Sequence, residues 1–180
     1  MFKKCILSAA ILTSTIGIAA AGSAPYIGAS LGLITNTSSN AGNGNAGNFR
    51  GIPVDVFIGY SSMMDQSISL AGELIGTIGT GELSNKNGLK TSYGYGLSVL
   101  PGVMLSDHTL ASIRIGVVQS RFVSVNSIAT GGQAGLAVQT SLSQHIDLRS
   151  EYDYTIYQTV SGIQSPRSDA FNLGLVCKFE

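Results

Sequence analysis

The chain has 180 residues, of which 44% are hydrophobic and only 11% are charged, and its formal net charge is zero. Soluble domains carry about 25% charged residues on average, so this composition is unusually apolar for a soluble protein. The neutral balance excludes a general nucleic-acid binder, which would present a strongly basic field, and the hydrophobic content excludes a chain that is disordered throughout.

The first residues have the pattern of an export signal. Lys3 and Lys4 precede an apolar run over 5–21, and small residues follow it. This order predicts a secretory signal peptide over residues 1–22 and a mature domain over 23–180. The alternative is an N-terminal membrane anchor, for which the apolar run is short. The mature chain would keep one cysteine, Cys177, so no internal disulfide is expected.

The rest of the chain alternates apolar and polar or small residues with a period of two, which is typical of strands. In 171–179, for example, Phe171 and Leu173 share one face, and Asn172 and Gly174 share the other. Segments of about this length cross a bilayer when strands are tilted by about 45°. The predicted strands, in chain order, are 25–34, 52–60, 67–78, 91–100, 111–118, 134–142, 146–154 and 171–179.

The face opposite the apolar side chains is rich in Gly and Ser and carries charges, which suits the narrow interior of an eight-stranded barrel. A soluble secreted barrel, the alternative, would turn its apolar face inward. In lipid the barrel must close, because an open edge leaves backbone groups unpaired. We therefore predict an all-β fold: an eight-stranded antiparallel up-and-down transmembrane β-barrel after a cleaved signal peptide.

The inward charges allow two interpretations. Charges inside a membrane span are costly unless they are paired, so these side chains form either an ion-pair plug that fills the lumen or a charge-selective conduction path. The narrow interior favours the plug. The predicted lumen ion-pair residues are Asp55, Glu73, Arg114, Arg149, Glu151, Asp153 and Lys178.

The predicted links alternate in length, with short links at 61–66, 106–108 and 143–145 and long ones at 35–51, 79–90, 123–133 and 158–169. Outer-membrane barrels have short periplasmic turns and long extracellular loops, so both termini are expected in the periplasm. The Asn-, Gly- and Ser-rich segment 35–48 is expected to be a mobile loop.

Aromatic residues gather near the predicted strand ends, as they do in the two interfacial girdles of membrane barrels. The girdle candidates are Tyr26, Tyr60 and Phe179 at the periplasmic side, and Tyr93, Tyr95, Tyr154, Tyr157 and Phe171 at the extracellular side.

Three stretches carry a family resemblance. Residues 93–122 (YGYGLSVLPGVMLSDHTLASIRIGVVQSRF) and 135–157 (GLAVQTSLSQHIDLRSEYDYTIY) resemble successive hairpins of opacity-protein-like small outer-membrane β-barrels, and the tail AFNLGLVCKF resembles their closing strand. The resemblance implies a surface antigen of the Gram-negative outer membrane whose C-terminal strand is read by the barrel-assembly machinery. Two positions depart from the family pattern: Glu180 follows the last aromatic, and Leu110-Ala111 stands where an aromatic is common.

No motif points to catalysis. Both histidines, His108 and His145, fall in predicted periplasmic turns. A lipid-modifying enzyme would need its catalytic histidine beside a nucleophile in the extracellular half of the barrel, which neither histidine can reach. No cluster has the composition of a metal site, and GTIGTG at 76–81 leads into a turn-rich segment rather than a phosphate-binding helix. We therefore expect no enzymatic activity, no cofactor and no metal.

The sequence thus predicts a non-enzymatic surface barrel with a structural role in the membrane, and with adhesion or host contact through its extracellular loops. Its expected partners are outer-membrane lipids and lipopolysaccharide, the barrel-assembly machinery and a host surface ligand, but no nucleic acid. The alternatives are a narrow ion-conducting pore and, more distantly, a lipid-modifying membrane enzyme.

Overall fold

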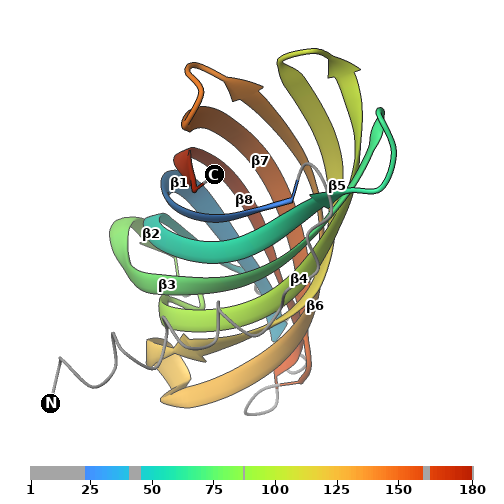
Figure 1. Cartoon of the computed structure of the whole chain (residues 1–180). Coiled ribbons are helices and arrows are strands. Elements are labelled where there is room, and N and C mark those ends of the chain that lie inside the picture. Colours follow the sequence, from blue (N-terminus) through green and yellow to red (C-terminus); the bar gives the residue numbers. More distant parts are fainter. Residues whose placement is uncertain (1–22, 41–45, 87, 160–162, 180) are drawn as a thin grey trace, which may run out of the picture.

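The computed structural model describes residues 23–40, 46–86, 88–159 and 163–179, so the predicted signal peptide lies outside the described residues. Within them no helix has the length and apolar character needed to span a membrane. Figure 1 shows the strands curving around one axis. The strands are β1 Ala24–Asn40, β2 Ala46–Met63, β3 Ile68–Lys86, β4 Thr91–Ser106, β5 Thr109–Phe122, β6 Ser127–Ser141, β7 Ile146–Tyr157 and β8 Ile163–Lys178.

Each strand pairs antiparallel with its neighbours in the sequence, and β1 pairs with β8 to close the barrel. Ile27 on β1, for instance, lies opposite Ile58 on β2 and Cys177 on β8. In Figure 1 the red β8 accordingly runs beside the blue β1. The predicted all-β, eight-stranded up-and-down topology is confirmed.

The barrel turns its apolar side chains outward. On β8, Phe171, Leu173 and Leu175 are about half exposed, whereas the alternate residues Asn172 and Val176 are buried. This is the reverse of a soluble barrel, because soluble monomers rarely expose contiguous apolar surface larger than a few hundred Å². The outer face therefore matches a lipid environment, and the soluble alternative does not fit the structure.

The outward face changes from apolar to polar at one level around the β1 seam. On β1 the change falls between Leu33 and Thr35, and on β8 between Phe171 and Asp169. The register pairs Leu33 with Phe171, and pairs Thr35 with both Asp169 and Arg50. The apolar belt thus lies toward the end where β1 begins and β8 finishes, which we call the proximal end. The strands project beyond the belt at the opposite, distal end.

The prediction of four long links is wrong, because the strands extend into these segments. The links at the distal end are 41–45, 87–90, 123–126 and 158–162, close in length to the proximal links 64–67, 107–108 and 142–145. Segments 35–40 and 46–51, predicted as loop, are paired ends of β1 and β2. Beyond the membrane the outward face of a strand meets water and need not be apolar, so the period-two hydrophobic pattern ends before the strand does.

A closed barrel with every strand paired should resist SDS until it is heated, since no unpaired edge is left for the detergent to invade. We expect unheated and boiled samples of the mature protein to migrate differently on a gel, and the far-ultraviolet circular dichroism to be that of β-structure. Predominantly helical dichroism, or identical migration of the two samples, would contradict this fold.

Candidate functional site

Four charged side chains cross the middle of the lumen. Arg114 Nη2 donates to Glu73 Oε1 at 2.5 Å and to Glu151 Oε2 at 3.0 Å, and Arg114 Nε donates to Glu151 Oε1. Arg149 Nη1 donates to Glu73 Oε2 at 2.5 Å. All four side chains are buried. We call Glu73, Arg114, Arg149 and Glu151 the lumen network.

Neutral groups complete the hydrogen bonds of the lumen network. Arg114 Nη1 donates to Ser98 Oγ at 2.9 Å, and Arg149 Nε donates to Gln139 Oε1 at 2.9 Å. The Tyr26 hydroxyl donates to Glu73 Oε2 at 3.0 Å. A buried ion pair is tolerated only when its remaining donors and acceptors are satisfied. The network therefore fills the cross-section of the barrel as one hydrogen-bonded unit drawn from several strands.

Tyr26 belongs to this unit, so its prediction as a girdle residue is wrong. The Arg149 guanidinium carbon lies 5.3 Å from the centre of the Tyr26 ring and 4.7 Å from that of Phe57. Tyr26 precedes the outward Ile27, and successive side chains of a strand point to opposite faces. Gly59 makes room for the ring, because a Cβ there would lie only 2.3 Å from it.

Tyr157 is the second wrong girdle assignment. Its ring is buried in the lumen against Phe122, with ring centres 5.0 Å apart, and its hydroxyl lies 3.0 Å from Ser120 Oγ. Its neighbour Ile156 is the outward residue at this end of β7. The other candidates lie on the outer face or just beyond it, and their interfacial role stays a prediction: Tyr60, Tyr93, Tyr95, Tyr154, Phe171 and Phe179.

The remaining predicted lumen residues, Asp55, Asp153 and Lys178, also point inward but lie outside the central network. Asp55 accepts a hydrogen bond from the Thr77 hydroxyl at 2.6 Å. Lys178 Nζ lies 3.1 Å from Asp147 Oδ1, near the proximal end. Asp147 was missing from the predicted lumen set, although its parity on β7 placed it on the inner face.

The link between β3 and β4 covers the distal mouth of the lumen. Leu89 is buried in an apolar cluster with Phe122 and Tyr157. Its carbonyl oxygen accepts a hydrogen bond from Asn36 Nδ2 at 2.7 Å. Gly88 fits against β2 because it lacks a side chain: a Cβ would lie 2.3 Å from the backbone there. We call residues 88–90 the mouth link, which the sequence pattern gave no reason to expect inside the barrel.

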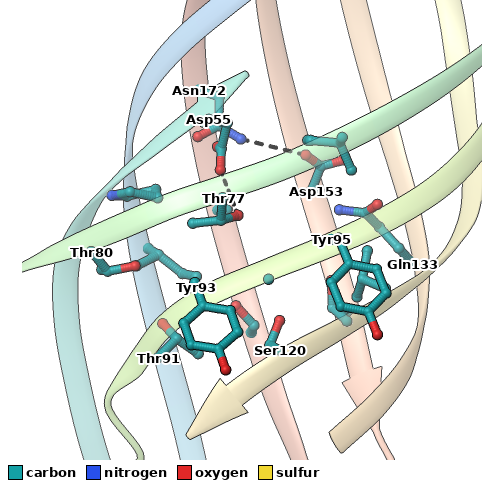
Figure 2. A pocket seen from close by; sticks show the side chains of 18 of the residues that line it. Asp55, Thr77, Thr80, Thr91, Tyr93, Tyr95, Ser120, Gln133, Asp153 and Asn172 are labelled. Atoms are coloured by element: carbon teal, nitrogen blue, oxygen red, sulfur yellow. Dashed lines mark hydrogen bonds between the residues drawn. The ribbon is translucent and has the colours of Figure 1, made fainter. Parts of the chain in front are cut away.

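Between the lumen network and the mouth link lies a chamber of about 70 Å³. Its lining includes Asp55, Asp153 and Asn172, which Figure 2 shows together with the threonine and tyrosine side chains around them. A second cavity of about 50 Å³, lined by Tyr26 and Lys178, lies on the proximal side. Around the network itself only about 10 Å³ is open, so the network separates the two cavities.

The histidines lie where the sequence placed them, exposed in proximal links away from the lumen network. The His108 carbonyl accepts from the Ser141 backbone, and the His145 carbonyl accepts from Lys178. In the part of the chain that the structure describes, no three His, Cys, Asp or Glu side chains converge on a common point where a metal ion could bind.

Comparison with known proteins agrees with this architecture. Residues 6–179 match the family model described as outer membrane protein beta-barrel domain. Among solved structures, Neisserial surface protein A has 18% identity and a TM-score of 0.56, over 88% of this chain and 99% of that one. Ail of Yersinia pestis, in complex with the heparin analogue sucrose octasulfate, has 15% identity and a TM-score of 0.51, over 86% and 99%.

At these identities the two structures support the fold alone. No curated protein is similar enough in sequence to this chain to count as a match. The family model, in contrast, covers nearly the whole chain, and it confirms the resemblance to small outer-membrane barrels seen in the hairpins. The chain therefore belongs to the outer membrane protein β-barrel family, whose members reside in the bacterial outer membrane.

Proposed function

We propose that this protein is a non-enzymatic surface barrel that reinforces the outer membrane and contacts anionic molecules at its distal end. The observation that carries the proposal is the length of the strands beyond the apolar belt. β2 has 18 residues and β3 has 19, whereas about 9–11 residues suffice to cross a bilayer. The surplus forms a protruding rim of paired strands rather than a set of long loops.

The rim is basic. Arginines and lysines outnumber acidic residues there by five to two, and attraction to phosphate or sulfate groups follows from this excess. The basic residues of the rim are Arg50, Lys86, Lys90, Arg121 and Arg167, and the acidic ones are Glu82 and Asp169.

Two of these arginines form a fork on the outer surface. Arg50 pairs in register with Thr35 and Arg167 with Thr37, so the two exposed side chains flank β1 just beyond the apolar belt. Among the described residues no acidic side chain lies within ion-pair distance of either one. Arg121, in contrast, donates to Asn126 Oδ1 at 2.8 Å and stacks on a tyrosine.

The position of the fork suits lipopolysaccharide phosphates in the outer leaflet, since guanidinium groups bind phosphate and sulfate in a bidentate manner. Ail, a barrel of similar fold, has been solved with a sulfated heparin analogue. That complex makes a sulfated sugar a second probe for this rim.

We expect the double substitution Arg50→Ala, Arg167→Ala to weaken binding to lipopolysaccharide and to sucrose octasulfate by roughly ten-fold or more, because each lost charged hydrogen bond contributes about 1.5–3 kcal/mol. Binding would be measured with the refolded barrel in zwitterionic detergent, at two salt concentrations. Arg121→Ala is the control: it removes one charge of the basic rim but no fork contact, because its guanidinium is already held by Asn126, and it should weaken binding clearly less than the double substitution does. Equal losses in the two variants, or none, would remove the fork from the proposal.

The proposal also places both termini in the periplasm and the rim outside the cell. An epitope inserted after Asn126, in the link between β5 and β6, should be labelled by antibody on intact cells. The same epitope inserted at Asp107, in a proximal link, should be labelled only after lysis. The reverse pattern would invert the orientation and leave the fork facing the periplasm.

A further inference from the structure

The charges inside the barrel do not balance. The lumen network pairs two arginines with two glutamates, and Lys178 pairs with Asp147 at 3.1 Å. Two inward carboxylates, Asp55 and Asp153, remain without a cation of their own, and both are buried. Buried charges are costly unless they are paired with an opposite charge or bound to a metal ion.

The neighbours of these carboxylates do not supply the missing charge. Asp55 accepts a hydrogen bond from the neutral Thr77. Asp153 Oδ1 lies 3.6 Å from Arg114 Nε, but the Nε proton is donated to Glu151 instead. Glu151 is a like-charged neighbour of both aspartates. Repulsion among these carboxylates adds to the cost of leaving both aspartates ionised.

Both carboxylates line the chamber of about 70 Å³, together with amide oxygens that lack a donor (Figure 2). Asn172 is 7% exposed; its Nδ2 donates to Asp153 Oδ2 at 3.4 Å, whereas its Oδ1 has no hydrogen-bond partner among the described residues. The same holds for Gln133 Oε1 and Asp153 Oδ1. No arginine, lysine or histidine is among the residues that line the chamber. The chamber therefore presents an excess of oxygen acceptors and negative charge.

The chamber has a route to solvent. Pairing between β3 and β4 ends at Thr77 and Gly94, although β3 continues to Lys86. Thr80 and Tyr95, which lie on either side of this parted seam, line the chamber. Tyr95 pairs with Gln119, at the level where the outer face of β5 has become polar. Side chains bridge this gap, since Thr80 Oγ1 donates to the Ser92 carbonyl at 3.5 Å and Lys90 pairs with Glu82 at 2.9 Å. We infer that a small ion enters past these contacts from the aqueous rim, without crossing the lumen network.

We propose that the chamber binds a hard divalent cation, with Ca²⁺ as its best match. Ca²⁺ takes carboxylate, amide and water oxygens in flexible geometry, and its two charges balance Asp55 and Asp153. Gln133 supplies an amide oxygen, and Asn172 supplies a second one once its amide turns over and exchanges the Nδ2 contact with Asp153 for an Oδ1 contact with the ion. About 10–15 Å³ of such open space is enough for one water molecule, so the chamber of about 70 Å³ has room for the ion together with several waters. With only two carboxylates the affinity belongs to the weak range of extracellular sites, about 10⁻⁴–10⁻³ M.

Terbium luminescence provides the test, because Tb³⁺ replaces Ca²⁺ at oxygen sites and is excited by energy transfer from nearby tyrosine. The buried Tyr157 lines the chamber, the exposed Tyr93 and Tyr95 border it from the outer side, and the chain has no tryptophan. Barrel refolded without lipopolysaccharide, in zwitterionic detergent, should give sensitised emission that millimolar Ca²⁺ displaces. Emission should fall at least five-fold in Asp55→Asn, Asp153→Asn. It should stay unchanged in Asp65→Asn, which removes an exposed carboxylate from a proximal link.

Two substitutions that leave the net charge unchanged test whether oxygen ligands, and not the negative charge alone, hold the ion. Asn172→Ala should raise the Ca²⁺ concentration needed for displacement several-fold, although it removes no charge. Tyr157→Phe should dim the emission without moving that concentration, which would place the ion in this chamber. Emission that survives the double substitution, or that is insensitive to Tyr157→Phe and Asn172→Ala together, would overturn the assignment.

A stability measurement on the wild-type barrel tests the proposal even if the substituted variants fail to fold. Millimolar Ca²⁺ should raise the urea midpoint of the wild-type barrel more than Mg²⁺ does, and more than Na⁺ at equal ionic strength, because a ligand of the folded state stabilises it. Absence of sensitised emission together with an unchanged midpoint would show that protonation of the two aspartates, rather than a cation, resolves the charge imbalance, and the proposal would fail.

Discussion

Arg114→Ala is expected to lower the free energy of unfolding by about 3–5 kcal/mol. Water that enters the lumen would solvate the unpaired carboxylates and reduce this loss. Removing one partner of a buried ion pair leaves the other charge uncompensated. Here the loss would expose Glu73, Glu151 and Asp153 to one another, with Arg149 as the remaining nearby guanidinium. The measurement is the urea midpoint of the detergent-refolded barrel, followed by tyrosine fluorescence or by the heat-dependent gel shift.

Arg121→Ala is the matched control, since Arg121 lies on the same strand but points outward at the rim. Surface contacts of this kind are worth about 0–1 kcal/mol. We expect the Arg114 and Arg149 variants to be clearly less stable than the Arg121 variant. Equal and small losses in all three would mean that the lumen is wet and that its charges line a channel.

Leu89→Ala should destabilise the barrel by about 2–5 kcal/mol, the range for truncating a buried leucine. Leu89 is 2% exposed and packs against Phe122 and Tyr157. Leu83→Ala is the control on the same hairpin, because Leu83 is 58% exposed and such surface changes usually stay within about 0.5 kcal/mol. Equal effects would show that the mouth link packs over the lumen too loosely to close it.

The period-two pattern predicted the faces of the strands well, because a lipid-facing surface must be apolar. The same parity brought Glu73, Arg114, Arg149 and Glu151 into one lumen, although it did not say which carboxylate each arginine would contact. That choice depends on the stagger between strands, which the sequence pattern does not encode.

The failures all lie near the barrel ends, but they have separate causes. Residues 35–40 and 46–51 read as loop because no membrane imposes alternation on them, yet their backbones pair. Tyr26 and Tyr157 were assigned from residue type and position near a strand end, while parity would have placed both inward. Leu89 stands alone in a polar link, so no periodic pattern marked it as part of the core.

The central claim is that the lumen is closed by the lumen network and the mouth link, and planar-bilayer recording tests it most directly. The wild-type barrel, refolded and inserted into a bilayer, should show no discrete conductance steps. Arg149→Ala, which removes one side chain of the network, should introduce them. Stable, cation-selective steps from the wild-type barrel, unchanged by Arg149→Ala, would contradict the account and identify the protein as a narrow pore.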